Sequence, residues 1–147
     1  MFFGAHEVKI DAKGRMAVPV RFREEILSMG NGEIIVTVDM KKDSYLLLYP
    51  RPQWDEFQAQ LLDLEYDEGV RMIQRRVLGY ARETTMDAQG RISISGFLRK
   101  QASLEKEALL IGQGRRFELW DEAAWSERCD SFELSAEVKG KLSSLKM

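Results

Sequence analysis

Two short segments of this chain carry an arginine next to a carboxylate at the same spacing. Residues 11–15 read Asp-Ala-Lys-Gly-Arg and residues 87–91 read Asp-Ala-Gln-Gly-Arg, so that Asp, Gly and Arg recur 76 positions further on. A guanidinium group offers a planar fork of N–H donors that fits a phosphate or the edge of a guanine base. These residues could therefore bind an anion at two related places.

The aspartates and glycines of the two segments have a structural explanation of their own. Asp at the first position and Gly at the fourth favour a type I turn, and a glycine with positive φ lets the turn close a three-residue hairpin with a bulge. The Asp side chain can also accept backbone N–H bonds within the turn. We therefore interpret Asp11, Gly14, Asp87 and Gly90 as turn-shaping residues.

The two arginines, Arg15 and Arg91, are not required by such a turn. Each could pair with its own Asp and brace the turn, which contributes about 0–1 kcal/mol when the pair is exposed. Each could also point outward, oriented by that Asp, toward an external anion. The repeated register favours anion binding, with Lys13 of the first turn assisting. Duplication of a purely structural device is the alternative.

Charge is distributed unevenly along the chain. The formal net charge is −2 and the isoelectric point is about 5.6, so the overall field does not favour nucleic acid. Acidic residues concentrate in "DLEYDE" and "WDEAAWSE". Further basic residues follow the two turns, namely Arg21, Arg23, Arg99 and Lys100. The sequence thus predicts a molecule that is basic near the turns and acidic over its helices.

The two turns belong to two copies of one predicted order of strands and helices. In each copy a strand reaches the turn and returns, a short helix follows, and a second hairpin ends near Tyr49 or Trp120. Alternating apolar residues such as Met16 and Val18 predict the returning strand. The second half of this order repeats at an offset of 71, so copy one is longer, and we place several extra residues in the loop "MKKDS", residues 40–44.

Helical spacing marks the segment between the copies. Trp54, Phe57 and Leu61 recur at helical intervals, a second such set begins at Val70, and Gly69 marks the break between two helices. A third helix should begin at Asp121, whose carboxylate can cap it. Arginines at 71, 75 and 82 are interpreted as a solvated helix face.

These elements give a mixed α+β fold, mainly β, with two tandem hairpin-rich repeats. We place the boundaries at 5–52 for the first repeat, 53–80 for the inter-repeat helices, 81–124 for the second repeat, and 125–147 for a C-terminal helix and tail.

Residues for catalysis or for a resident metal are few. One histidine, His6, and one cysteine, Cys129, cannot supply the ligands of a zinc site. No glycine pattern for binding nucleotide phosphates occurs, and no apolar run approaches the roughly 20 residues of a membrane span. We predict no enzymatic activity, no cofactor, no metal, no small-molecule substrate and no membrane association. A single cysteine fits a reducing cytoplasm.

Several ordered motifs together resemble the MraZ family of bacterial regulators, a tandem member of the SpoVT/AbrB-like group. They are "MFFGAHEVKIDAKGRMAVPVRFRE", "LLLYPRPQWDEF", "MDAQGRI" and "KEALLIGQGRRFELWDEAAW", which span nearly the whole chain. The resemblance implies two SpoVT/AbrB-like repeats interleaved as a swapped-hairpin barrel and flanked by helices. It also implies closed-ring self-association and sequence-specific binding to repeated promoter elements.

The family's Asp-x-x-x-Arg motif falls on residues 11–15 and 87–91, which implies that Arg15 and Arg91 contact DNA. Among the departures from the family pattern, Ser95 stands where the second copy often has Pro, so we expect the second short helix to begin more loosely than the one after Pro19.

The function implied by this resemblance is that of a cytoplasmic, nucleoid-associated regulator that represses its own division and cell-wall operon by binding double-stranded promoter DNA. One alternative is a protein-binding antitoxin-like or scaffold ring, in which the same arginines meet acidic protein surfaces. Another is an enzyme that acts on an anionic metabolite.

Overall fold

The structure is a computed structural model that describes residues 1–41 and 45–147. Its strands are β1 (Phe2–Lys9), β2 (Arg15–Ala17), β3 (Glu33–Val38), β4 (Tyr45–Pro50), β5 (Arg82–Thr85), β6 (Arg91–Ser93), β7 (Glu107–Gly114) and β8 (Arg116–Asp121). Its helices are α1 (Val20–Gly30), α2 (Arg51–Leu62), α3 (Glu68–Gly79), α4 (Gly96–Gln101), α5 (Glu122–Ser131) and α6 (Ala136–Leu142).

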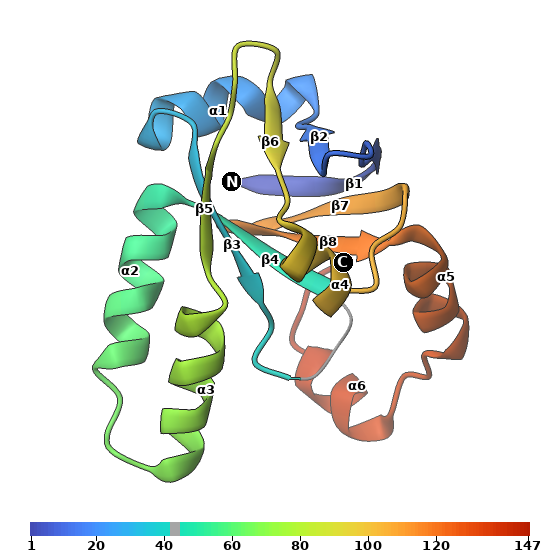
Figure 1. Ribbon diagram of the computed structural model, residues 1–147. Helices are drawn as coiled ribbons and strands as arrows, with labels where there is room; N and C mark the ends of the chain where they lie inside the picture. Colours follow the sequence, from blue (N-terminus) through green and yellow to red (C-terminus); the bar gives the residue numbers. More distant parts are fainter. Residues whose placement is uncertain (42–44) are drawn as a thin grey trace.

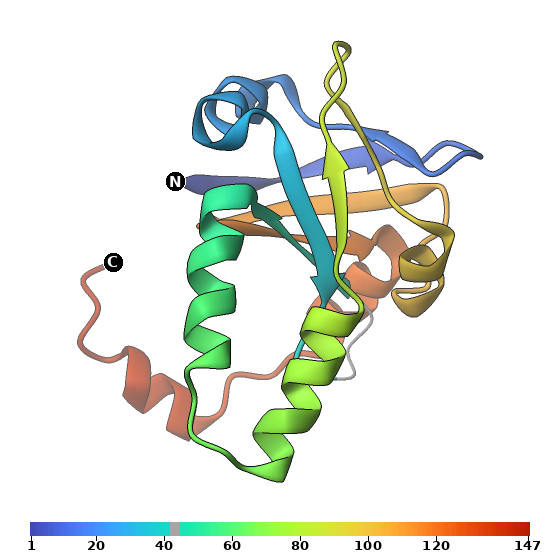
Figure 2. The same ribbon diagram turned by 60° about the vertical axis from the view of Figure 1, so that its left-hand side comes forward.

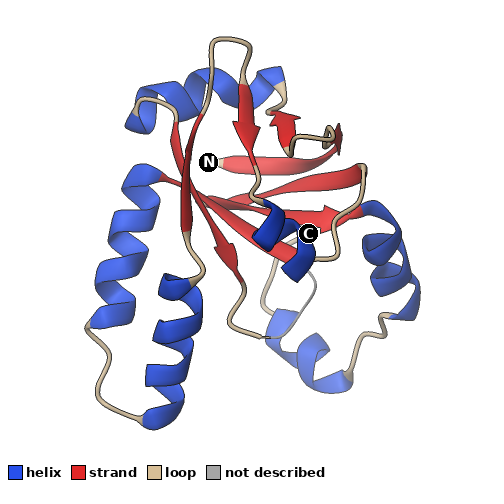
Figure 3. Ribbon diagram, viewed as in Figure 1, coloured by secondary structure: helices blue, strands red, loops and turns tan. Residues whose placement is uncertain are grey.

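A six-stranded antiparallel sheet in the order β1-β7-β8-β4-β3-β5 forms the centre of the fold, and helices surround it (Figures 1 and 3). Strands β2 and β6 form a separate antiparallel ribbon. The expectation of a mixed α+β fold, mainly sheet, is confirmed. Pairing in the described sheet ends at β1 and β5, and closure into a swapped-hairpin barrel stays a prediction.

Most strand pairs join the two copies of the repeat. β1 pairs with β7, β3 with β5, β4 with β8 and β2 with β6, whereas β3–β4 and β7–β8 are hairpins within one copy. The two strands beside the first turn diverge, and a single bridge between Ile10 and Met16 joins them. The turn itself closes locally, because the N–H of Asp11 donates to the carbonyl of Arg15 at 2.9 Å, but the strands beyond it pair mainly with strands of the other copy.

The physical reason lies in the core, which is shared by the copies. Met16 of β2 and Ile92 of β6 are directly opposite each other and are each only 1% exposed. They join one hydrophobic cluster with Phe2, Phe22 and Phe117, whose rings pack edge-on or tilted. Each fully buried side chain of this size contributes about 1.5–3 kcal/mol, which stabilises the pairing between copies.

Helices α2 and α3 cover the other face of β3 and β4. Ile35, Leu47 and Tyr49 form a second cluster with Trp54 of α2 and Val77 of α3. Because the opposite face of these strands belongs to the main core, β3 and β4 are buried on both sides. This explains the almost unbroken apolar run of "EIIVTV".

The helix starts follow capping chemistry. The two inter-repeat helices are present, but the break lies at residues 63–67, because Asp67 caps α3 and Gly69 is inside its first turn. Asp121 caps α5, as predicted, by accepting the N–H of Ala124. The extra loop of copy one, predicted at residues 40–44, falls largely on residues 42–44, which lie outside the described residues.

Candidate nucleic-acid interface

The first turn is built around the carboxylate of Asp11. Its Oδ1 atom accepts the backbone N–H groups of Lys13 and Arg15, both at 2.9 Å, and its Oδ2 atom accepts the Nε–H of Arg15, also at 2.9 Å. The N–H of Gly14 donates to the carbonyl of Asp11, and Gly14 has φ of +83°. Asp11 and Gly14 therefore make the hydrogen bonds that close this turn.

The second turn repeats this arrangement. Asp87 accepts the backbone N–H groups of Gln89 at 3.0 Å and Arg91 at 2.8 Å, and the Nε–H of Arg91 at 3.0 Å. Gly90 has φ of +78°, and its N–H donates to the carbonyl of Asp87. The turns differ at one side chain, because the second has Gln89 where the first has the exposed Lys13.

Both aspartates are held in the charged form. The backbone N–H of the arginine four residues on lowers the pKa of Asp11 and of Asp87 below the ordinary 3.8, against the opposing effect of desolvation. The bonded guanidinium lowers the pKa further. Each turn therefore carries a fixed carboxylate that grips the Nε side of its arginine and orients the terminal amino groups.

The arginines remain accessible to a ligand. The side chain of Arg15 is 37% exposed and that of Arg91 is 35% exposed. Within the described residues, the terminal amino groups of Arg15 form no hydrogen bond, and those of Arg91 form one long contact of 3.5 Å with Gln89. Bracing by Asp and availability to an external anion therefore coexist.

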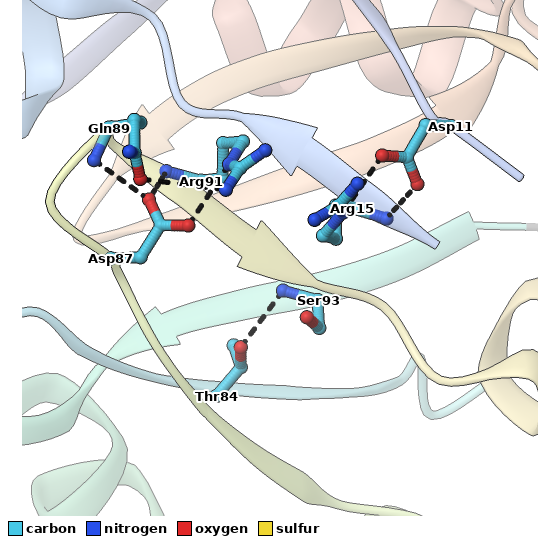
Figure 4. A network of polar contacts seen from close by, with 7 residues as sticks. All are labelled: Asp11, Arg15, Thr84, Asp87, Gln89, Arg91 and Ser93. Carbon is cyan, nitrogen blue, oxygen red and sulfur yellow. Dashed lines mark hydrogen bonds and ion pairs between the residues drawn. The ribbon is translucent and has the colours of Figure 1, made fainter. Parts of the chain in front are cut away.

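The ribbon of β2 and β6 places both arginines on one surface. Arg15 is opposite Ser93, and Ala17 is opposite Arg91. Met16 and Ile92, which lie between the two arginines in the ribbon, point into the core. Arg15 and Arg91 therefore lie on the outward face as diagonal neighbours, with Cα atoms about 7–8 Å apart. In Figure 4 the two arginines lie between the two aspartates.

Hydrogen bonds from each copy support the turn of the other. The N–H of Ile94 donates to the carbonyl of Gly14 at 2.7 Å, and the N–H of Val18 donates to the carbonyl of Gly90 at 2.8 Å. These bonds extend the ribbon by one residue pair at each end. The family resemblance implied interleaved repeats but not these particular bonds, whose only residue-level signal is the apolar alternation that returns inward at Val18 and Ile94.

The start of α4 differs from the expectation. Ser95 has φ of −60° and ψ of 150°, close to the −52° and 136° of Pro19 before α1. Its hydroxyl accepts the N–H of Leu98 at 3.2 Å and so caps the helix. The expected loosening is not found, because the serine replaces the rigidity of proline with a capping bond.

Two of the arginines interpreted as a solvated helix face have partners within the chain. On α3, Arg75 pairs with Glu68 at 3.0 Å, and Arg71 lies over the ring of Tyr66. Figures 1 and 2 show α3 at the end of the molecule opposite the second turn. Within residues 1–41 and 45–147, no group of three His, Cys, Asp or Glu side chains could hold a metal. No helix in that same part of the chain is long and apolar enough to cross a membrane.

Fold and site together define a class of protein: an α+β chain of two intertwined repeats that presents two carboxylate-held arginines on one outward ribbon. The family model for MraZ protein matches this chain twice, over residues 1–76 and 77–140. The chain belongs to the MraZ family.

Three relatives illustrate the similarity, and each bears the name transcriptional regulator MraZ. The protein of Haemophilus influenzae (strain PittEE) is 48% identical over 126 residues, which cover 85% of this chain and 83% of the relative. That of Shewanella amazonensis is 44% identical over 89% of this chain and 86% of its own length. That of Halorhodospira halophila is 39% identical over 99% of both chains.

Proposed function

We propose that this chain regulates transcription by binding double-stranded DNA with the outward face of the β2–β6 ribbon. Arg15 and Arg91 contact the duplex, Lys13 assists at the first turn, and Asp11 and Asp87 orient the two guanidinium groups. The observation that carries the proposal is the common outward face of the two arginines. The three relatives share the name transcriptional regulator MraZ, which supports the biological role.

The spacing of the arginines suits a polyanion. Duplex DNA carries one negative charge per about 1.7 Å of its axis, so two arginines whose Cα atoms are about 7–8 Å apart can reach the same short stretch of DNA backbone. A planar guanidinium can also read guanine in the major groove. Backbone contacts supply most of the affinity, whereas base contacts supply the sequence preference.

Self-association explains how a subunit of net charge −2 can bind DNA. One ribbon offers few contacts and is a weak site alone. In a closed ring, several ribbons engage repeated promoter elements, and tethering raises the apparent affinity by roughly 10²–10⁴. We propose this ring as the active form, with the interleaved repeats closing into a barrel in each subunit. It acts in the cytoplasm, at the nucleoid, as a repressor of its own division and cell-wall operon.

The test is a salt titration of binding to a duplex that carries the region upstream of the chain's own gene. Each phosphate engaged should add about 0.9 to the fall of log affinity with log salt. Arg15→Ala and Arg91→Ala should weaken binding and flatten that dependence. Arg75→Ala, which removes an arginine paired with Glu68 on α3, is the matched control and should bind as the parent does.

Two results would count against the proposal. Parental affinity in folded Arg15→Ala and Arg91→Ala proteins would remove the arginines from the interface. If the chain binds an acidic protein, and binds the duplex only weakly and almost independently of salt concentration, the antitoxin-like or scaffold role would be favoured instead.

A further inference from the structure

A second arginine lies against the first turn and comes from the other copy. The Nε atom of Arg99, on α4, donates to the carbonyl of Ile94 at 3.1 Å. Its Nε and Nη2 atoms lie 3.0 and 3.1 Å from the position that a Cβ would occupy at Gly14. The guanidinium of Arg99 is therefore packed on the backbone of the turn that leads directly into Arg15.

The second turn has the equivalent arrangement, with the roles of the two copies exchanged. Arg23, on α1 of the first copy, donates its Nε–H to the carbonyl of Val18 at 2.7 Å. Its side chain occupies the space that a Cβ at Gly90 would take. Arg23 and Arg99 are 76 positions apart, so the repeat carries this arginine as well as the one in the turn. Each turn needs glycine for its positive φ and for the close approach of this cation.

The charge of these two arginines is not balanced from within the chain. In the described parts of the protein, neither Arg23 nor Arg99 forms an ion pair with a carboxylate, and each uses only its Nε–H in a hydrogen bond to a carbonyl. Arg51, Arg75 and Arg115, by contrast, each face an acidic side chain. Both Arg23 and Arg99 are half-buried. A partly desolvated cation without a carboxylate is stabilised when an external anion binds it.

We propose that each turn forms a composite phosphate site made by both copies: Arg15 with Arg99 at the first turn, and Arg91 with Arg23 at the second. In each pair, an Asp carboxylate accepts the Nε–H of the turn arginine and a backbone carbonyl accepts the Nε–H of the helix arginine. The terminal amino groups of both arginines bind the phosphates of the DNA backbone. The inference rests on the proposed function, which it deepens by naming four phosphate-binding side chains instead of two. Neither copy by itself holds a complete site.

The decisive variant is Arg99→Gln. The amide nitrogen of glutamine is the same number of bonds from the backbone as Nε of arginine, so it can still donate to the carbonyl of Ile94, but the charge and the terminal fork are gone. On the upstream duplex, Arg99→Gln should reduce the slope of log affinity against log salt by about 0.9 for each subunit engaged. The ratio of parental to variant affinity should therefore shrink about 3.5-fold per subunit between 50 and 200 mM salt.

Two further variants separate contact from positioning. Arg99→Ala loses the bond to Ile94 too, and amide NMR spectra should shift at Gly14 and Arg15 more than at Gly90 and Arg91. Arg99→Gln should leave those amides close to their parental positions. Lys100→Ala removes an exposed charge of the same helix and should keep the parental salt slope and spectrum.

The outcomes distinguish the inference from the function on which it rests. If Arg99→Gln keeps the parental slope, or changes it no more than Lys100→Ala does, Arg99 makes no phosphate contact and the composite site is wrong. Arg15→Ala in the same assay tests the proposed function separately, because it can weaken binding whether or not Arg99 takes part. Parental affinity in both Arg15→Ala and Arg91→Ala would remove both ideas.

Discussion

Replacing Gly14 with alanine should destabilise the fold, because this glycine meets two independent restrictions. Its φ of +83° lies in the left-handed region, where an L-residue costs roughly 1–2 kcal/mol. An added Cβ would also lie 2.5 Å from the carbonyl oxygen of Ile94, and this oxygen is backbone held by Arg99. The neighbour cannot rotate away as a flexible side-chain end would.

The expected magnitude follows from these two terms. Overpacking of a fixed contact costs about 1–3 kcal/mol, and the lower chain entropy of unfolded alanine offsets about 0.4–1 kcal/mol. Gly14→Ala should therefore lower the free energy of unfolding by about 1–5 kcal/mol. For a chain of this size, each kcal/mol corresponds to roughly 2–4 °C in Tm.

Thermal unfolding followed by circular dichroism, at one protein concentration, measures this loss. Gly79→Ala is the matched control, because Gly79 ends α3 and nothing lies within 4 Å of an added Cβ. It should keep the parental Tm or raise it slightly, since alanine favours the helix by about 1 kcal/mol. A Gly14→Ala protein that melts within a degree of the parent would refute the reasoning, because the turn would then yield without cost.

Three other predictions concern the two turn aspartates and the buried hydroxyl of Thr37. Asp11→Ala should weaken DNA binding less than Arg15→Ala, by loosening the turn, and parental affinity would show that Asp11 does not orient the arginine. Because the pKa values of Asp11 and Asp87 are lowered, their stabilising contribution is present above the ordinary 3.8 and is lost as pH falls through the lowered values. NMR titrations of the Asp11 and Asp87 carboxyl groups should give midpoints below pH 3.8. The midpoint of Asp11 should stay below 3.8 in Arg15→Ala, because the backbone N–H of residue 15 is still present; midpoints at or above 3.8 would contradict this explanation. Thr37→Val should cost about 1–3 kcal/mol without changing DNA affinity, since it removes the 2.5 Å bond to the carbonyl of buried Val77; an unchanged unfolding free energy would refute it.

Local features of the fold could be predicted because short-range chemistry decides them. The Asp11 and Asp87 turns, the capping role of Asp121 and the two inter-repeat helices each depend on residues within a few positions of one another. The exact break between the helices was missed, because Asp67 competes with Gly69 as the boundary signal and the side-chain cap prevails.

Partners across the repeats could not be predicted in the same way. Strand β2 has three residues, too few to encode a register, and its pairing with β6 depends on the core that Met16 and Ile92 fill together. The contact of Arg99 with Gly14 depends on that pairing, since it brings Ile94 beside the turn.

The sequence by itself determined that this chain holds two copies of an Asp- and Gly-shaped turn that ends in arginine, because turn and capping preferences act between near neighbours. Only the tertiary structure decided that the two arginines share one outward face and that an arginine of the opposite copy lies on each turn. Those placements arise when apolar residues far apart in the chain are buried together, and hydrophobic burial has no direction that a local pattern could specify.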